Sequence, residues 1–174
     1  ISEGLVGSEM CIRDSSKKVL MFHFDLKKVF LASIFSIFTI GLLSFLTYRL
    51  NLGIFLLASF GSTMVLLFGY PESPFAKPKN IFFGHILTSL IGILFFKFIS
   101  LPVFVIIPLA VGLGVAIMIG LNITHPPAGG NPIIMISSSA SFDFLLSPVI
   151  SGSIILIVFG FILNRFVANN NYPK

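Results

Sequence analysis

A nine-residue stretch, THPPAGGNP from Thr124 to Pro132, separates two long apolar runs and constrains the fold of the whole chain. Its prolines lack the backbone N–H that an α-helix requires, and each restricts the residue before it. We therefore expect a helix to break here. Because an unpaired backbone group facing lipid is costly, a break at membrane depth must be buried in protein or line a polar cavity. The break is thus a candidate functional site.

The rest of the chain is too apolar for a soluble protein. Of its 174 residues, 56% are hydrophobic, 10% are charged and 21 are Phe, whereas about 25% of residues are charged in a typical soluble domain. The composition predicts an all-α integral membrane protein of five to six short transmembrane segments, without a separate soluble catalytic domain. The single Cys11 excludes an internal disulfide. The net charge of +5 gathers at segment ends, which indicates membrane topology and not nucleic-acid binding.

The two ends of the sequence differ from this apolar domain. Ile1 to Ser15 has no helical period and resembles translated adapter sequence, so we expect a non-native or disordered tail, with the native start at Met21 or lost. Residues 16–28 are expected to form a basic cytoplasmic N-terminus, whose lysines orient the first span or bind anionic headgroups. The expected transmembrane domain covers residues 29–167, and residues 168–174 form a polar tail.

Uninterrupted apolar runs predict where the chain crosses the membrane. At 1.5 Å rise per residue, about 20 residues cross a core of about 30 Å. The expected long spans are Val29 to Tyr48, Leu52 to Tyr70, Ile81 to Ile99, Val103 to Ile123 and Phe144 to Leu163. Ile133 to Phe142 covers about 15 Å, so it either crosses together with the break or forms a re-entrant loop. Pro71 to Asn80, with three prolines, is expected to be a surface turn or a gate.

The distribution of lysine and arginine favours six crossings with both termini in the cytoplasm, here of a bacterial inner membrane. In that arrangement Arg49 and Lys97 lie on one side, against nine basic residues on the other: Arg13, Lys17, Lys18, Lys27, Lys28, Lys77, Lys79, Arg165 and Lys174. If Ile133 to Phe142 is re-entrant, Arg165 and Lys174 lie on the other side, and the basic residues are then divided seven against four. The second distribution agrees less well with the positive-inside rule.

A weak internal repeat relates the two halves of the chain. Gly61 to Leu67 aligns with Gly129 to Met135, and in each half a long helix precedes a small-residue polar stretch, an apolar run and another helix. Three segments per repeat is an odd number, so the two repeats would be inverted in the membrane. Transporters are often built this way, with the substrate site where two discontinuous segments meet. Chance similarity of small residues is the alternative.

Five short motifs occur in a fixed order along half of the chain: Gly61-Ser62, Pro71-Glu72-Ser73-Pro74, Pro78-Lys79-Asn80, Gly84-His85 and His125-Pro126-Pro127-Ala128-Gly129. In order and approximate spacing they resemble the HPP family of small integral membrane proteins. The resemblance implies a transporter; plastid and cyanobacterial members are tied to nitrite, and other bacterial members have no settled substrate. Gly130-Asn131-Pro132 departs from the small residues and Thr that commonly follow the family motif.

Polar residues around the two small-residue stretches suit a small anion, because helix N-termini carry partial positive charge. His125 is expected to bind an anion or gate by protonation, or else to cap carbonyls freed at the break. His85 either pairs with the motif or packs at the interface. The histidines lack metal-ligand spacing, so neither a metal nor another cofactor is expected. The candidate substrate-binding or gating residues are Ser59, Gly61, Ser62, Thr63, Glu72, Lys79, Asn80, His85, His125, Pro126, Pro127, Gly129, Gly130 and Asn131.

Three classes of function remain open at this point. The first is a transporter or channel for a small inorganic anion, nitrite-like by the resemblance. The second is a noncatalytic membrane scaffold or sensor. The third is an intramembrane His-dependent enzyme, which we do not expect because the sequence offers neither paired carboxylates nor an activated nucleophile. The expected partners are the lipid bilayer and the anion, with a homo-oligomer left open and nucleic acid excluded.

Overall fold

Residues 25–173 are described by a computed structural model, and the regular secondary structure in that range is helical. Four helices are long and apolar enough to cross a membrane: α2 (Leu26–Tyr48), α4 (Pro78–Phe98), α5 (Val103–Gly120) and Leu145–Val167, which comprises η4 (Leu145–Ile150), α7 (Ser151–Ile162) and η5 (Leu163–Val167). The prediction of an all-α integral membrane protein is confirmed. Expectations about Cys11, Arg13, Lys17, Lys18, Met21 and Lys174 lie outside the described residues.

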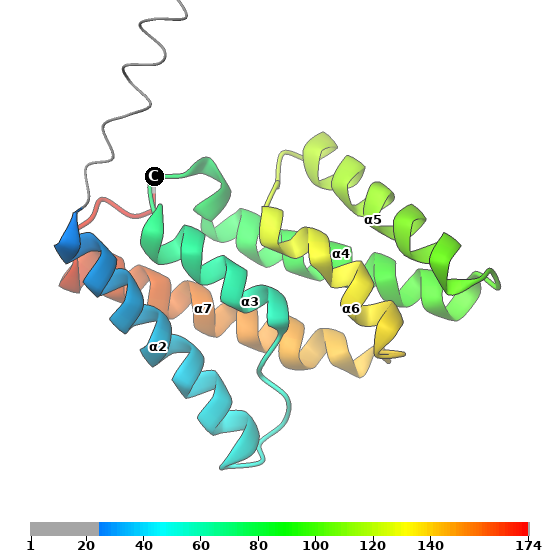
Figure 1. Ribbon diagram of the computed structural model, residues 1–174, viewed down its shortest axis with the longest axis horizontal. Coiled ribbons are helices and arrows are strands. Elements are labelled where there is room, and N and C mark those ends of the chain that lie inside the picture. Colours follow the sequence, from blue (N-terminus) through cyan, green and yellow to red (C-terminus); the bar gives the residue numbers. More distant parts are fainter. Residues whose placement is uncertain (1–24, 174) are drawn as a thin grey trace, which may run out of the picture.

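Two shorter helical segments lie between the long helices (Figure 1). In the first half of the chain, α3 (Ala58–Met64) continues into η1 (Val65–Gly69). In the second half, η3 (Pro126–Gly130) continues into α6 (Asn131–Ser137). Each short segment follows extended backbone, with φ −132° at Leu57 and φ −133° at His125. A single turn, η2 (Pro74–Ala76), lies in the loop before α4.

The helix bounds correct three expectations from the sequence. The break spans residues 121–125, upstream of the prolines, because Pro126 begins η3, where a missing N–H leaves no hydrogen bond unmade. The expected span Leu52 to Tyr70 is helical only over Ala58–Gly69, since Gly53 at φ +130° belongs to an irregular connection. The expected loop Pro71 to Asn80 ends early, because Pro78 occupies the first turn of α4.

Contacts at the two ends of α4 show which segments of the chain meet at each end. Near its start, Lys28 Nζ of α2 lies 3.6 Å from Glu72 Oε1, and the Tyr172 hydroxyl donates to the Ala76 carbonyl at 2.9 Å. We call this the terminal end, because it gathers the start of α2, the loop before α4 and the C-terminal tail. At the far end, Lys97 Nζ lies 5.0 Å from the centre of the Phe142 ring.

The segment after the break runs the full length of α4. His125 Nδ1 is 2.8 Å from the Phe75 carbonyl oxygen at the terminal end, whereas Phe142 lies beside Lys97 at the far end. The last helix then returns to the terminal end. The described chain thus has four long helices and two short helical segments, and Ile133 to Phe142 belongs to a segment that runs from the terminal end to the far end of α4.

Glycine packing supports the predicted inverted repeat. A Cβ added to Gly92 of α4 would lie 2.8 Å from Met135 Cβ, and one added to Gly160 of α7 would lie 2.7 Å from Leu67 Cδ1. Likewise, a Cβ added to Gly84 would lie 3.5 Å from Ala128 Cβ, and one added to Gly152 would collide with the Phe60 ring. Corresponding residues are 68 apart (84 to 152, 92 to 160, 60 to 128, 67 to 135), as are Gly61 and Gly129. Each half therefore packs its short segment against the third helix of the other half.

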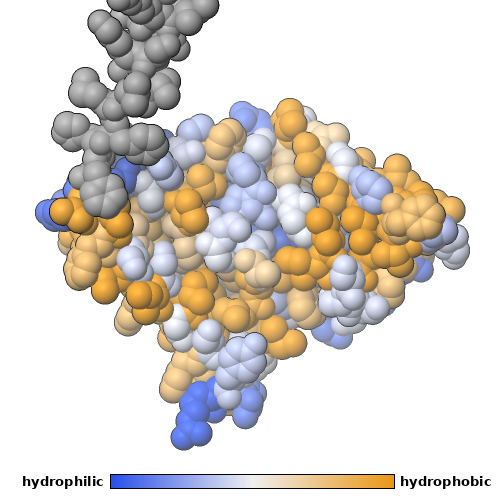
Figure 2. Space-filling model, viewed as in Figure 1, coloured by the Kyte–Doolittle hydropathy of each residue, from blue (hydrophilic) through white to orange (hydrophobic). Residues whose placement is uncertain are grey.

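The outside of the bundle is apolar and its inside is partly polar. Large side chains such as Phe30 on α2 and Phe104 on α5 are exposed, while His85, Thr88 and Ser89 on α4 are fully buried. Figure 2 shows hydrophobic residues over much of this face, strongly hydrophilic residues at the two ends of α2, and residues of intermediate hydropathy across the middle. This distribution is the reverse of a soluble protein's and suits a bilayer. Helix α4, which packs against α5, α6, α7 and η3, carries the buried polar residues.

Candidate functional site

A buried polar cluster joins the break to helices from both halves. It consists of Thr63 on α3, His85 on α4, His125 before η3 and Asn131 at the start of α6, each with 0% of its surface exposed. Thr63 Oγ1 lies 3.1 Å from His85 Nε2 and 3.0 Å from His125 Nε2. We call these four residues the histidine cluster. A single hydroxyl therefore bridges two imidazoles that are 40 residues apart in the sequence.

Gly84 allows the break to approach α4 closely enough for this bridge. A Cβ at Gly84 would lie 2.9 Å from the Cβ of His125 and 3.5 Å from the carbonyl oxygen of Ile123. Asn80, one turn earlier on α4, fixes the same region from its other side. Its Nδ2 donates to the Pro74 carbonyl at 3.1 Å and to the Thr124 carbonyl at 3.0 Å. Asn80 thus ties the break to the loop before α4.

Carbonyl partners determine which nitrogens carry hydrogen. The Phe75 carbonyl can only accept, so His125 Nδ1 donates to it, and Nε2 of the neutral ring accepts from Thr63. The side-chain atom of Asn131 that lies 3.2 Å from the His85 carbonyl must be Nδ2, and the same nitrogen lies 3.0 Å from His85 Nδ1. His85 Nδ1 accepts, so its Nε2–H donates to Thr63. The hydrogen bonds run in one direction, from Asn131 through both imidazoles to Phe75.

The other predicted residues near the break surround this cluster. Ser59 is buried, and its carbonyl oxygen lies 3.1 Å from Thr63 Oγ1. Gly129 and Gly130 are half-buried, and a Cβ added to either would meet no atom within 4 Å. Pro127 is half-buried and Pro126 is exposed. Open space therefore adjoins the backbone that follows the HPP motif.

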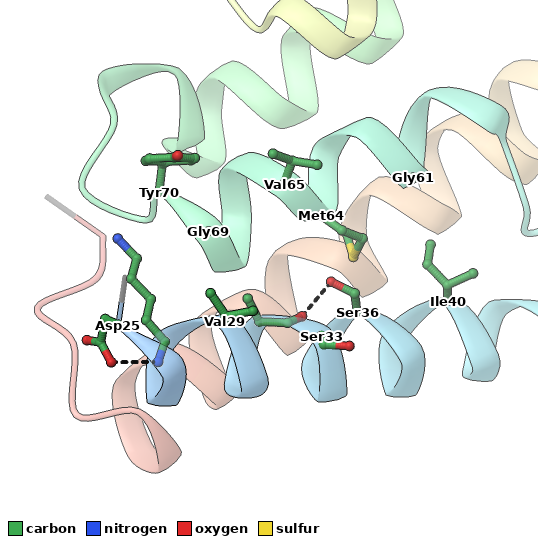
Figure 3. Close-up of a pocket in the computed structure, with 12 residues that line it drawn as sticks. Asp25, Val29, Ser33, Ser36, Ile40, Gly61, Met64, Val65, Gly69 and Tyr70 are labelled. Atoms are coloured by element: carbon green, nitrogen blue, oxygen red, sulfur yellow. Dashed lines mark hydrogen bonds between the residues drawn. The ribbon is translucent and has the colours of Figure 1, made fainter. Parts of the chain in front are cut away.

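Four predicted site residues lie neither in the histidine cluster nor around the break. Gly61 and Ser62 are exposed on α3, because positions 59 and 63 share the buried face of that helix. Gly61 instead lines an apolar groove of about 720 Å³ between α2 and the segment Ala58–Gly69 (Figure 3). Glu72 is exposed and pairs with Lys28, and Lys79 is exposed at the start of α4.

Two polar contacts beside the histidine cluster involve residues that the sequence did not single out. Ser89 Oγ lies 3.0 Å from Asn131 Nδ2, and the Thr88 hydroxyl donates to the Gly84 carbonyl at 2.7 Å. Helical spacing places residues 84, 85, 88, 89 and 92 on one face of α4, so this pattern of small and polar residues was a readable signal. The role of the Phe75 carbonyl could not be predicted, because every residue has a backbone carbonyl and the residue type does not show which one accepts a hydrogen bond. Within residues 25–173, no group of three or more His, Cys, Asp or Glu could hold a metal ion.

Together, the fold and the cluster define a helical membrane protein in which the short segment of each half packs against the third helix of the other half, around buried polar residues. The HPP transmembrane-region family matches residues 21–173, so the chain belongs to the HPP transmembrane family. The predicted family resemblance is thereby confirmed.

Two transmembrane proteins of Dictyostelium discoideum are similar to this chain. One is 32% identical over 159 residues, covering 86% of this chain and 51% of the relative. The other is 30% identical over 125 residues, covering 68% of this chain and 44% of the relative. The chain thus spans about half the length of these curated relatives. No solved structure matches it.

Proposed function

We propose that this chain is a membrane transporter or channel for a small inorganic anion, nitrite-like by resemblance to its family. The observation that carries the proposal is the meeting of two broken segments, one from each inverted half, at Thr63 and His125. In transporters built from inverted repeats, substrates bind where such segments meet. The proposal assigns no enzymatic activity.

The chemistry of the interior supports an anion more than a cation. The buried polar residues that the structure describes include hydroxyls, amides and two histidines, and no Asp or Glu. An anion entering this interior therefore meets hydrogen-bond donors without repulsion from a buried carboxylate. Space beside the Cα atoms of Gly129 and Gly130 leaves room next to these donors for a small ion.

Basic residues support an orientation with both termini in the cytoplasm; the membrane is proposed to be a bacterial inner membrane. Among the described residues, two basic side chains belong to the far end, Arg49 and Lys97. Five belong to the terminal end: Lys27, Lys28, Lys77, Lys79 and Arg165. Since basic residues gather on the cytoplasmic side, the terminal end is proposed to be cytoplasmic.

A scaffold or sensor is the second candidate function. The two Dictyostelium relatives are about twice as long as the matched region, so in those proteins a membrane module of this kind is joined to further sequence. A scaffold would hold its polar cluster as a packing element and would move no ion.

A flux assay in liposomes separates the two candidates. Purified protein is reconstituted, and uptake of nitrite, nitrate, formate, bicarbonate and chloride is measured against protein-free liposomes. We expect protein-dependent uptake of at least one of these anions. Uptake of none would reject the transport proposal and favour the scaffold.

A further inference from the structure

We propose that Thr63 passes a proton between His85 and His125, so that the histidine cluster is a proton relay linking the two halves of the repeat. The coupling of this relay to anion movement rests on the function proposed above. The relay itself rests only on the geometry of the cluster. Its ligand is the proton.

The distances and burial of the three side chains fit direct transfer. Oγ1 of Thr63 is within 3.1 Å of the Nε2 atoms of both histidines, and all three residues are fully buried. Each imidazole is held at its other nitrogen, His85 by Asn131 at 3.0 Å and His125 by the Phe75 carbonyl at 2.8 Å. The rings therefore present Nε2 to the same hydroxyl.

Thr63 has one hydrogen and two acceptors, which lets the cluster hold an extra proton. When His125 is neutral, its Nε2 needs the Thr63 hydrogen. When His125 is charged, both ring nitrogens donate, and the Thr63 hydroxyl can turn to the Ser59 carbonyl, 3.1 Å away. Thr63 Oγ1 then accepts from both rings. The same side chains thus satisfy their hydrogen bonds in either protonation state.

An acceptor also exists for a charged His85. The Oδ1 atom of Asn131 is buried and has no hydrogen-bond partner among the described residues. If Nδ1 of His85 gains a proton, the Asn131 amide turns over and Oδ1 accepts that hydrogen. The His85 carbonyl, inside α4, keeps the backbone hydrogen bond of its helix.

The transfer moves one proton and no electrons. Starting from a charged His85, the Nε2–H bond breaks as its proton binds Thr63 Oγ1. The original Thr63 O–H bond breaks as that proton binds His125 Nε2. His85 is then neutral, and His125 is an imidazolium that still donates from Nδ1 to Phe75. Because the histidines belong to opposite halves, positive charge has moved from the first half to the second.

The titratable group that faces each histidine is the other histidine, with ring centres 5.0 Å apart. Among residues 25–173, no hydrogen bond or ion pair joins either imidazole to Asp, Glu, Lys or Arg. The other titratable side chains of residues 25–173 all lie outside the cluster: Asp25, Lys27, Lys28, Tyr48, Arg49, Tyr70, Glu72, Lys77, Lys79, Lys97, Asp143, Arg165 and Tyr172. The relay therefore depends on the two imidazoles.

Proton influx into liposomes tests the relay. Wild type, Thr63→Val and Thr63→Ser are reconstituted with an internal pH dye, and a pH gradient is applied with or without external nitrite or nitrate. Protein-free liposomes correct for permeation of nitrous acid. The matched control is Thr39→Val, because Thr39 is equally buried on α2 and its hydroxyl has no partner among the described residues.

We expect Thr63→Val to reduce protein-dependent proton influx by at least roughly 100-fold, the lower end of the contribution of a positioned proton-transfer group. Thr63→Ser should retain most of the influx, and Thr39→Val all of it. A second measurement needs only the wild type: nitrogen-15 NMR should show hydrogen on Nδ1 of neutral His125 and on Nε2 of neutral His85. The opposite tautomers would overturn the relay, even if Thr63→Val fails to fold.

The remaining outcomes separate the relay from the proposed function. Proton influx that is absent in the wild type, or equal in wild type and Thr63→Val, overturns the relay. Anion uptake without proton movement also overturns it and leaves the transport function intact. Proton influx that requires the Thr63 hydroxyl, without uptake of any tested anion, supports the relay and rejects anion transport.

Discussion

Gly84→Ala tests whether close packing of the break against α4 builds the site. The added Cβ would lie 2.9 Å from His125 Cβ, whereas carbon atoms in contact prefer about 3.5–4.0 Å. The break must therefore withdraw by about 1 Å. That shift would lengthen the 3.0 Å contact between Thr63 and His125 beyond hydrogen-bonding range. Overpacking of this kind typically costs about 1–3 kcal/mol.

Two measurements follow from this shift. Thermal unfolding in detergent should show a midpoint several degrees below that of the wild type, and the His125 tautomer signal should change. The control is Gly112→Ala on α5, where an added Cβ would meet no atom within 4 Å. An alanine there should be neutral or stabilising, because glycine is the weaker helix former by about 1 kcal/mol. Wild-type stability and an unchanged His125 signal in Gly84→Ala would refute the packing argument.

Three further predictions concern the charge of His125, the C-terminal tail and the topology. If His125 acts in its charged form, transport should fall as pH rises through the imidazole range, near about 6.5 in water. His125→Gln should transport weakly and lack this pH response. Identical pH profiles for the wild type and His125→Gln, measured at matched anion concentrations, would reduce His125 to a structural cap. Tyr172→Phe removes the bond to Ala76 and should loosen the tail by about 1 kcal/mol, measured by limited proteolysis. Burial raises the pKa of the Tyr172 hydroxyl, so the wild-type tail should resist proteolysis below pH about 10 and become more susceptible as pH rises above it. The Tyr172→Phe variant should lack this pH dependence. In a chain without Cys11, cysteines at Phe75 and Asn170 should be labelled from one side and one at Leu52 from the other; labelling of Phe75 and Asn170 from opposite sides would contradict six crossings.

The long helices were predictable because a lipid-facing helix must be apolar along its length. The expected span beginning at Val103 starts at that residue, and Val29 to Tyr48 differs from α2 only at its start. The break was placed too far along the chain. Pro126 and Pro132 suggested irregular backbone, yet proline in a first helical turn is compatible with a helix, and the segment from Pro126 is helical.

The candidate site was predictable in composition and less so in geometry. Thr63, His85, His125 and Asn131 were all named, but nothing in a single sequence shows that one hydroxyl lies between two distant histidines. Gly61 and Ser62 were grouped with Thr63 by proximity in the chain, whereas helical periodicity turns them to the outside. The offset of 68 residues between equivalent positions extends to Gly84 and Gly152. Contacts were needed to show that these glycines play matching roles.

The central claim is that an anion passes where the two broken segments meet, and Gly129→Leu tests it most directly. Space beside Gly129 accepts a larger side chain without collision at Cβ, so the variant should fold and insert. Gly112→Leu is the matched control, since Gly112 is exposed on α5 with equally open surroundings. In the liposome assay, Gly129→Leu should abolish anion uptake while Gly112→Leu retains it. Normal uptake by correctly inserted Gly129→Leu protein would contradict the claim.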